Sequence, residues 1–329
     1  MQENQEFTVS VAPMMDWTDR HCRWFHRRLS ARALLYTEMV VADAVIHGPR
    51  ERLLGFAPCE HPVALQIGGS DPEKLAQAAK IGEGFGYDEI NINIGCPSDR
   101  VQSGRFGACL MAEPDLVAQC YDAMAAAVDV PVTVKCRLGI DDQDLSQTLP
   151  EFIEKVAAAG CTHFIVHARK AWLKGLSPKE NRDVPPLDYG LVQQIKRDFL
   201  QLEIVLNGGI KDIETAKAET ENLNGVMLGR AAYHDPWILT QVDESFYGQA
   251  AFAQTRDDII EDLIGYARTQ QDIDRTTKAL IRHIMGLFAG QVGARLWRRS
   301  LSEGLMSKAP PSEIIAQAYA AMQDARKAA

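Results

Sequence analysis

The sequence predicts an α/β protein: a (β/α)8 TIM barrel followed by a C-terminal all-helical domain. Eight short apolar or β-branched segments alternate with helical patterns over roughly 240 residues, which is the strand number and size of such a barrel. Polar, charged and glycine residues stand at the ends of many of these segments, and barrels carry their active sites at the carboxyl ends of the strands. An open doubly wound sheet is the rival fold. However, no GxGxxG follows the first strand, and that fold would gather such residues at one switch point.

Four strands are expected in the first half of the barrel, at residues 7–12, 33–38, 62–69 and 89–94. Each is a short run of apolar and β-branched residues that ends at a proline, a glycine or a polar residue. A helical pattern rich in arginine, residues 18–30, separates the first two strands, and residues 40–56 form an irregular segment with a helical part. After the third strand, Ser70-Asp71-Pro72-Glu73 begins a helix with its N-cap and proline signals in order.

Four further strands are expected at residues 131–138, 162–167, 203–206 and 225–228. Helical patterns cover residues 114–128, 149–159, 187–200 and 213–220, and a long loop, residues 168–186, follows the sixth strand. After Gly248 the pattern becomes wholly helical, with apolar residues at spacings of three and four. We therefore expect a barrel domain over residues 1–248 and a domain of three or four helices over residues 249–329.

The composition is that of a globular protein, with 46% hydrophobic and 24% charged residues among 329. The net charge of −9 argues against a protein that coats nucleic acid, although a local basic stripe is enough to contact phosphates. Residues 1–6 lack the features of a signal peptide, and no apolar run approaches the roughly 18 residues of a membrane helix. The seven cysteines include no CxxC pair. We expect a cytoplasmic, monomeric protein without disulfides, bound metal or membrane contact.

The most informative stretch is Asn91 to Ser98, which reads Asn-Ile-Asn-Ile-Gly-Cys-Pro-Ser. Successive side chains of a strand point to opposite faces, so isoleucines line one face and the amides of Asn91 and Asn93 line the other. Cys96 follows between a glycine and a proline, where packing needs no sulfur. It is a small buried hydrophobe, a nucleophile or a proton donor, and no adjacent base in the sequence decides between the two chemical roles. Cys109, in the same loop, is the competing candidate.

Two glycine turns close the seventh and eighth expected strands: Asn207-Gly208-Gly209 and Gly229-Arg230. Loops seven and eight form the usual phosphate site of a TIM barrel. Glycines there let backbone N–H groups approach a phosphate, and an arginine adds charge. Lys135 and His167 end the fifth and sixth strands. A lysine in the barrel interior needs a partner such as an anionic or electron-rich ring, and the alternative is a lysine that extends into solvent. We expect a phosphate-bearing ligand over these strand ends.

Basic residues gather in the loop after the sixth strand and in the helical domain. They are Lys179 and Arg182 in the loop, and Arg295, Arg298 and Arg299 in the helical domain. The three arginines flank Trp297 at spacings that place them on one helix face. A single cluster of this kind is usually a solvated surface, but several clusters with an aromatic residue among them fit a nucleic-acid backbone better.

Taken together, these motifs resemble those of the tRNA-dihydrouridine synthases. The motifs are Val11-Ala12-Pro13-Met14-Met15-Asp16, residues 91–98 with Gly104 and Gly107, Val134-Lys135-Cys136-Arg137, His167-Ala168-Arg169, Asn207-Gly208-Gly209 and Met227-Leu228-Gly229-Arg230. The segment Ser177 to Leu187 is similar to the A-type branch of that family, which acts on uridines 20 and 20a of the tRNA D-loop. The likeness covers nearly the whole chain.

The resemblance implies FMN on the barrel, NADPH as the reductant and tRNA as the substrate, held in part by the helical domain. It implies FMN contacts from Pro13, Met14, Met15, Gln66, Lys135, His167, Asn207, Gly208, Gly209, Gly229 and Arg230. It also implies that hydride passes to C6 of uracil, that Cys96 donates a proton to C5 and that Asn93 faces the base. The tRNA contacts are then expected from Lys179, Arg182, Arg295, Arg298 and Arg299.

Two other functions remain as alternatives. A flavin barrel that acts on a free small molecule, such as a relative of dihydroorotate dehydrogenase, would have no use for the arginines of the helical domain. A non-catalytic RNA-binding barrel would have no use for a thiol in the loop after the fourth strand.

Overall fold

The computed structural model describes residues 7–270 and 278–327, and it contains a closed barrel of eight parallel strands. Strands pair in chain order, and the last pairs with the first to close the barrel, with Val11 opposite Leu228. The strands are β1 (Thr8–Val11), β2 (Leu34–Val41), β3 (Val63–Gly68), β4 (Glu89–Ile94), β5 (Val132–Arg137), β6 (His163–His167), β7 (Glu203–Asn207) and β8 (Gly225–Leu228). The predicted (β/α)8 barrel is confirmed.

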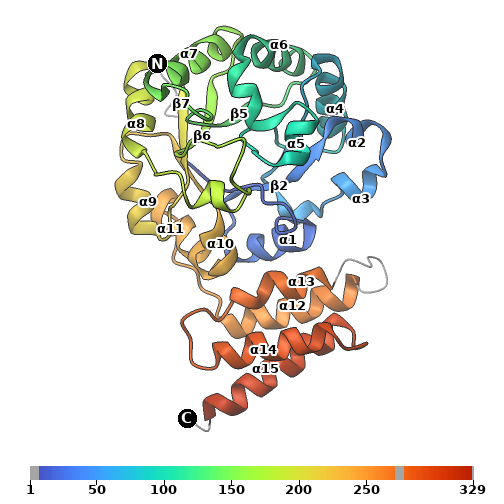
Figure 1. Cartoon of the computed structure of the whole chain (residues 1–329). Coiled ribbons are helices and arrows are strands. Elements are labelled where there is room, and N and C mark those ends of the chain that lie inside the picture. The colour runs from blue at the N-terminus through green and yellow to red at the C-terminus, as the bar shows by residue number, and fades with distance from the viewer. Residues whose placement is uncertain (1–6, 271–277, 328–329) are drawn as a thin grey trace. The chain divides into compact units, whose positions relative to one another are not determined.

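The longer helices between the strands lie around the outside of the barrel (Figure 1). The helices between strands are α2 (Ala42–His47), α3 (Arg50–Leu54), α4 (Pro72–Gly84), α5 (Asp99–Ser103), α6 (Pro114–Ala125), α7 (Leu145–Ala158), α8 (Tyr189–Asp198) and α9 (Ile213–Glu219). Three 3-10 helices accompany them: η1 (Pro58–Glu60), η2 (Gly107–Ala112) and η3 (Glu180–Arg182). Helix α4 fits closely against the barrel, because a Cβ atom on Gly82 would lie 2.8 Å from Ile90. Ile90 therefore faces outward, and its neighbour Asn91 faces the barrel interior.

Both faces of the strands are buried, as in other parallel sheets covered by helices. All six residues of β4 are buried, including both asparagines. The apolar part of the barrel interior is a cluster of six buried residues, Ala12, Tyr36, Ala64, Ile165, Val205 and Met227. Met14, just beyond β1, packs against this cluster.

Two regions differ in detail from the sequence expectation. Residues 40–56, expected to be irregular with a helical part, contain two helices, α2 and α3, which have only six and five residues. Helices this short carry little periodic signal. Helix α7 begins at Leu145 rather than at residue 149, because Asp144 caps it by accepting a hydrogen bond from Ser146 N at 3.1 Å. Pro150 lies inside the helix rather than at its first turn.

The described chain separates into two compact units whose boundary differs from residues 248/249. The barrel unit comprises the chain up to Met15 together with Leu34–Gly229. The helical unit comprises Asp16–Ala33 and the chain from Arg230 onward. Helix α1 (Arg20–Leu29) therefore belongs with the C-terminal helices, although it lies between β1 and β2 in the sequence.

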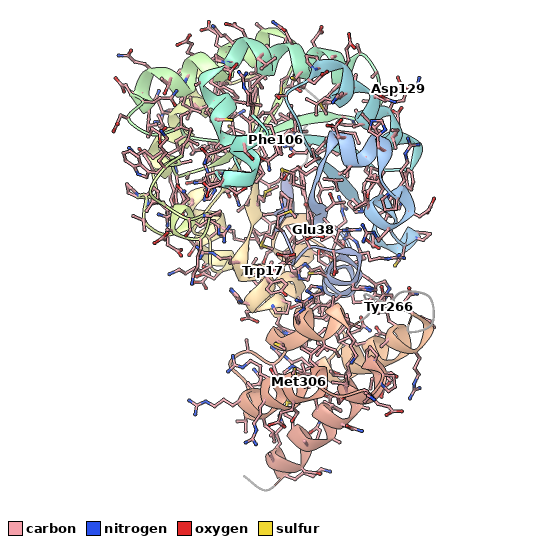
Figure 2. The ribbon with its side chains drawn as sticks, turned by 45° about the vertical axis from the view of Figure 1, so that its right-hand side comes forward. Trp17, Glu38, Phe106, Asp129, Tyr266 and Met306 are labelled. Carbon is pink, nitrogen blue, oxygen red and sulfur yellow. The ribbon has the colours of Figure 1, made fainter. Side chains whose placement is uncertain are left out.

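Contacts within the helical unit explain why α1 belongs there. Arg28 pairs with Asp262 at 2.8 Å, and the Trp24 and Tyr266 rings stack with their centroids 3.9 Å apart. Tyr266 is labelled in Figure 2, on a helix far along the chain from α1. Such contacts join residues more than 200 positions apart, so no local change in composition marks this boundary.

The other α-helices of the helical unit are α10 (Arg230–His234), α11 (Val242–Tyr247), α12 (Arg256–Gln270), α13 (Ala279–His283), α14 (Ala294–Leu305) and α15 (Pro311–Lys327). Helix α15 packs against α12 and α14, and Figure 1 shows α14 and α15 side by side. The apolar centre of these helices includes Trp297 and Phe288, whose ring centroids lie 5.1 Å apart. No helix within the described ranges is long and apolar enough to cross a membrane.

Candidate active site

A column of hydrogen-bonded polar side chains runs through the barrel interior from β4. Asn93 Nδ2 donates to Gln66 Oε1 at 2.7 Å, and Gln66 Nε2 donates to Asn91 Oδ1 at 2.8 Å. Asn91 Nδ2 in turn donates to Thr133 Oγ1 at 2.8 Å, and Thr133 donates to Glu89 at 2.6 Å. The predicted amide face of the fourth strand therefore exists, and it points into the barrel.

Glu89 ends this column at the first residue of β4, where Tyr36 also donates a hydrogen bond to its carboxylate. The donors and acceptors alternate along the column, so each amide has one orientation that satisfies its neighbours. The carbonyl oxygen of Asn93 is thereby turned away from Gln66. It is left to face the loop that follows the strand.

The side-chain carbonyl of Asn93 fixes the backbone at Cys96. Asn93 Oδ1 accepts hydrogen bonds from Gly95 N at 3.1 Å and from Cys96 N at 2.9 Å. The carbonyl oxygen of Cys96 accepts from Ala108 N at 2.9 Å. Gly107 allows this close approach, since its φ is +76° and a Cβ there would lie 2.6 Å from the Cys96 oxygen. The half-buried thiol then lies 3.6 Å from the Ser98 hydroxyl.

Cys109 occupies a different environment in η2. Its thiol donates to Phe106 O at 3.2 Å, and burial raises the pKa of that thiol. Phe106, labelled in Figure 2 on the segment that follows β4, is buried at 6% exposure. The thiol of Cys109 is thus used in a hydrogen bond to its own loop, whereas Cys96 is fixed by hydrogen bonds to its backbone.

Lys135 and Asn207 meet at the carboxyl ends of β5 and β7. Lys135 Nζ donates to Asn207 Oδ1 at 3.0 Å, and Asn207 Nδ2 donates to Met227 O at 2.8 Å. Burial, and next the charge of Arg137, lower the pKa of Lys135 to about 8. The structure therefore places a desolvated cation at the barrel mouth, with an amide as its hydrogen-bond partner.

His167 ends β6 in the same mouth. Burial, together with the positive charges of Arg137 and Lys135, lowers the pKa of this imidazole well below its usual value. His167 is therefore neutral at neutral pH and offers one ring donor and one ring acceptor. Arg169 and Arg182 add to the same positive field, which favours an anionic ligand.

Glycine turns follow β7 and β8, and open space is found at the second of them. Gly208 and Gly209 have φ values of +112° and +74°, which residues with a side chain rarely adopt. The turn is fixed by Tyr189, whose hydroxyl donates to Gly208 O at 2.7 Å. Beyond β8, a Cβ atom placed on Gly229 would meet no atom of the described chain within 4 Å. The sequence predicts a phosphate cradle at these turns, and the open space at Gly229 is compatible with that prediction.

The family model for dihydrouridine synthase matches residues 10–325. The chain belongs to the dihydrouridine synthase family. Three relatives named tRNA-dihydrouridine(20/20a) synthase are similar along nearly their whole lengths. The Vibrio cholerae protein is 54% identical, and the match covers 95% of each chain. The Shewanella oneidensis protein is 52% identical, over 98% of this chain and 96% of its own. The Xanthomonas campestris protein is 56% identical, over 94% and 92%.

Solved structures support the fold of this dihydrouridine synthase family member. Morphinone reductase superposes with a TM-score of 0.52 at 13% identity, over 77% of this chain and 88% of its own. An old yellow enzyme homologue from Zymomonas mobilis gives 0.51 at 12% identity, over 76% and 90%. At such low identity the likeness concerns the fold alone. The family resemblance inferred from the motifs is confirmed by the family match.

The remaining predicted cofactor contacts are distributed between the two units. Pro13 and Met14 are half-buried beyond β1, and Met15 is exposed at 56%. Arg230 directly follows Gly229 in the chain but begins α10 of the helical unit. The barrel unit thus brings together Gln66, Asn93, Cys96, Lys135, His167, Asn207, Gly208, Gly209 and Gly229.

The predicted RNA contacts are exposed on both units. Lys179 precedes η3 and Arg182 ends it, and both side chains are exposed. Arg295, Arg298 and Arg299 lie on α14, on the helix face that their spacing predicted.

One part of the basic-cluster expectation is wrong. Trp297 is fully buried, and its indole N–H donates to Ile284 O at 3.1 Å. It packs the helical core and is not a surface for stacking a base. Arg299 is also paired, through Nε, with Glu303 Oε1 at 2.7 Å. Arg295 and Arg298 are therefore the stronger candidates for phosphate contacts on this helix.

The sequence did not single out Arg137 or Gln102, whose side chains join separate loops of the barrel mouth. Arg137 lies two residues after Lys135 in the expected strand 131–138, so the two side chains share one face of it, which was the available signal. Gln102 lies in a five-residue helix that no periodicity revealed. Among the described residues, no group of three or more His, Cys, Asp and Glu side chains is placed to hold a metal ion.

Proposed function

We propose that this protein reduces uridine to 5,6-dihydrouridine in tRNA, at positions 20 and 20a of the D-loop, with FMN as cofactor and NADPH as reductant. The observation that carries this proposal is the thiol of Cys96, held beside Lys135 at a barrel mouth in a chain 54% identical to a tRNA-dihydrouridine(20/20a) synthase. A thiol, a desolvated cation and a phosphate cradle at one mouth match the parts that this reaction requires.

The residues of the mouth fit FMN. Gly208 and Gly209 lie in a positive-φ turn and Gly229 has open space above it, which suits a phosphate group. Lys135 carries a desolvated charge whose hydrogen-bond partner is a neutral amide, and an electron-rich ring above it would satisfy that charge. Neutral His167 is able to donate or accept a hydrogen bond at the ring edge. FMN, when bound, supplies the hydride that is added to C6 of uracil.

Cys96 is the proposed proton donor to C5 of uracil. Addition of hydride to C6 leaves negative charge on the pyrimidine, and a thiol is an adequate acid for protonating the adjacent carbon. Lys135 is an electrostatic neighbour of Cys96. The Lys135 ammonium stabilises negative charge on the bound ring, and its position does not require it to transfer a proton.

Asn93 has two proposed tasks. Its carbonyl oxygen already orients the backbone of Cys96, and one N–H of its amide is used by Gln66. An amide nitrogen carries two donors, so the second N–H is the one we assign to a carbonyl oxygen of the target uracil.

The tRNA is proposed to contact both units through their exposed basic residues. A base in folded RNA is stacked or paired, so uridine must leave the stack to reach a ligand in the barrel mouth. Lys179 and Arg182 lie in the loop that follows β6, close to that mouth in the chain. Arg295 and Arg298 on α14 supply charge for phosphates elsewhere on the RNA.

The test is whether the purified protein holds flavin and modifies tRNA. We expect yellow protein that retains FMN, oxidises NADPH slowly and forms dihydrouridine in tRNA from cells that lack this gene. The modification should map to positions 20 and 20a, and restoring the gene should restore it in cells.

Other outcomes point to other functions. Colourless protein that rejects added FMN would remove the flavin proposal. Activity on free uridine or dihydroorotate, with none on tRNA, would indicate a small-molecule flavin barrel instead.

A further inference from the structure

Two loops of the barrel mouth carry different parts of the proposed reaction. The first, residues 95–107, follows β4 and holds Cys96. The second, residues 168–186, follows β6 and holds Lys179 and Arg182. Two side chains outside the proposed chemistry, Arg137 and Gln102, hydrogen-bond to the backbones of both loops.

Arg137 is the last residue of β5, lies between the two loops and is 3% exposed. Its Nε donates to Gly95 O at 2.8 Å, one residue before the cysteine. Its Nη1 donates to Lys170 O at 3.1 Å and to Asn181 O at 3.0 Å, in the second loop. The planar fork of a guanidinium makes these three bonds in fixed directions, which a lysine ammonium does not reproduce.

Gln102 makes a second connection from the other end of the first loop. Its amide nitrogen donates to Pro97 O at 2.8 Å and to Leu173 O at 2.8 Å. Both donors of the amide are used, one for each loop. Arg137 and Gln102, which we call the two bridges, therefore bind the carbonyl oxygens of the residues immediately before and immediately after Cys96.

The second loop is itself stiffened where the bridges attach. Asn181 is fully buried, accepts a hydrogen bond from Trp172 N at 2.8 Å and donates to Trp172 O at 2.9 Å. Its amide also donates to Leu176 O at 3.1 Å. Arg182 follows Asn181 directly, and Lys179 lies two residues before it. A displacement of either residue therefore also displaces the Asn181 carbonyl oxygen, which accepts the hydrogen bond from Arg137.

We propose that Arg137 and Gln102 are positioning residues that couple RNA contacts on the loop after β6 to the placement of the Cys96 thiol. This inference rests on the proposed function, since it takes Cys96 as the proton donor and Lys179 and Arg182 as RNA contacts. Binding of RNA phosphates by the second loop sets the position of residues 95–97 through these two side chains. Misplacing a reacting group by about 1 Å lowers a rate by up to about 100-fold, so the bridges control the chemical step.

The coupling is tested by a double-mutant cycle in single-turnover reactions. Full-length, FMN-loaded and pre-reduced enzyme is mixed with saturating tRNA, and dihydrouridine formation is timed while tRNA affinity is measured separately. Gln102→Ala is expected to slow product formation about tenfold and change tRNA affinity less than about twofold. Lys179→Ala is expected to weaken tRNA binding and, at saturation, to slow product formation. In the Gln102→Ala background that second effect on rate should be smaller, because only the Arg137 connection remains, while the loss of affinity is unchanged.

Matched controls separate positioning from general damage. Gln194→Ala removes an amide that donates to Asp198 on the surface of α8, and it should leave the single-turnover rate unchanged. Arg137→Lys keeps the charge but loses the fork, and it should slow product formation as Gln102→Ala does. Arg50→Lys removes a guanidinium that also bonds two backbone carbonyls, those of Val45 and Ile46, and it should not slow the reaction.

A third measurement follows Cys96 directly. The alkylation rate of Cys96, measured by mass spectrometry of its peptide in enzyme without tRNA, should differ from the wild-type rate in Gln102→Ala and in Arg137→Lys. FMN content and thermal stability should be retained in both variants.

The outcomes distinguish the inference from the function on which it rests. If Lys179→Ala slows product formation equally with and without Gln102, or affects binding alone, the coupling is wrong and the proposed function stands. The same holds if Cys96 is alkylated at the wild-type rate in both variants. If wild-type enzyme forms no dihydrouridine, or Cys96→Ala forms it at the normal rate, the proposed function or its proton donor fails first.

Discussion

Cys96 is placed by bonds to its backbone, which leaves its thiol free to take part in chemistry. Asn93, Ala108 and the groups on either side of the cysteine fix the chain, and the sulfur itself has a weak neighbour in Ser98. The sequence predicted the amide face of the strand and the thiol at its end from alternation alone. It did not predict that the Asn93 carbonyl would hold the cysteine, because the orientation of that amide depends on its hydrogen bond to Gln66, which belongs to β3.

Replacing Cys96 tests the assignment of the proton. Cys96→Ala removes the proposed acid and keeps the backbone bonds to Asn93 and Ala108, so FMN content and tRNA affinity should stay within about twofold. Loss of a general acid lowers rates by about 100- to 10,000-fold, and dihydrouridine formation should fall by that order. Cys109→Ala is the matched control, and it should retain activity. Normal product formation by Cys96→Ala, with loss in Cys109→Ala, would move the role to Cys109.

Lys135 gives a pH-dependent prediction for FMN-free protein. Its pKa is about 8 in the folded protein against an ordinary value of 10.5, so between these values the unfolded chain binds the extra proton. The free energy of unfolding should therefore rise with pH over that interval. Lys135→Met should abolish this rise and stabilise FMN-free protein at pH 7 by about 1–3 kcal/mol, since one pKa unit corresponds to about 1.4 kcal/mol.

The same variant should lose function where it gains stability. Lys135→Met is expected to bind FMN less tightly and to reduce tRNA more slowly, because the bound ring loses its cationic partner. Urea unfolding of FMN-free protein at several pH values, together with FMN titration, checks both parts. A variant that is less stable at pH 7, or that binds FMN equally well, would show that Lys135 has another role.

At the scale of elements, the candidate site lies at the ends of the strands. The regular alternation of strand and helix patterns makes the positions of those ends predictable. All eight strands were expected near their observed positions, because β-branched runs alternate with helical patterns. Elements of three to six residues, such as α5, η2 and η3, were not expected, since they are too short for periodicity to appear. These short elements shape the loops that hold Cys96, Lys179 and Arg182, so the finer geometry of the site depended on the structure.

The turn after β8 offers a test of the phosphate cradle. Gly229→Ala is compatible with the backbone, and its Cβ would meet no atom of the described chain within 4 Å. The variant should fold with unchanged stability, but a ligand phosphate in that space would clash with the new methyl group. We expect FMN affinity to fall about tenfold, equivalent to about 1.4 kcal/mol.

The control for this variant is the same substitution where space is also open. A Cβ atom on Gly84, at the end of α4, would likewise have no described neighbour within 4 Å, and Gly84→Ala should leave FMN affinity unchanged. FMN titration followed by fluorescence measures both. Unchanged affinity in Gly229→Ala would place the phosphate elsewhere, first at Gly208 and Gly209.

At the scale of the whole molecule, the acidic net charge of −9 and the proposed tRNA substrate are compatible. The positive groups that matter are local: those around His167 in the barrel mouth, and the arginines of α14. The composition change near residue 248 predicted a helical region but not its true extent. Helix α1 joins it through contacts distant in sequence, such as Arg28 with Asp262, which no local pattern contains.

If the arginines of α14 contact phosphates, they should contribute to the salt dependence of tRNA binding. Each phosphate contact adds about 0.7–0.9 to the slope of log affinity against log salt concentration. Arg295→Ala should weaken binding and reduce the slope by about that amount. Arg299→Ala should have a smaller effect, because Glu303 already offsets the charge of Arg299.

The control is Lys80→Ala, which removes an exposed cation on α4 and should leave both the affinity for tRNA and the slope unchanged. An unchanged slope in Arg295→Ala and Arg298→Ala would make this helix face an ordinary solvated surface, and the RNA would then depend on the barrel loops alone.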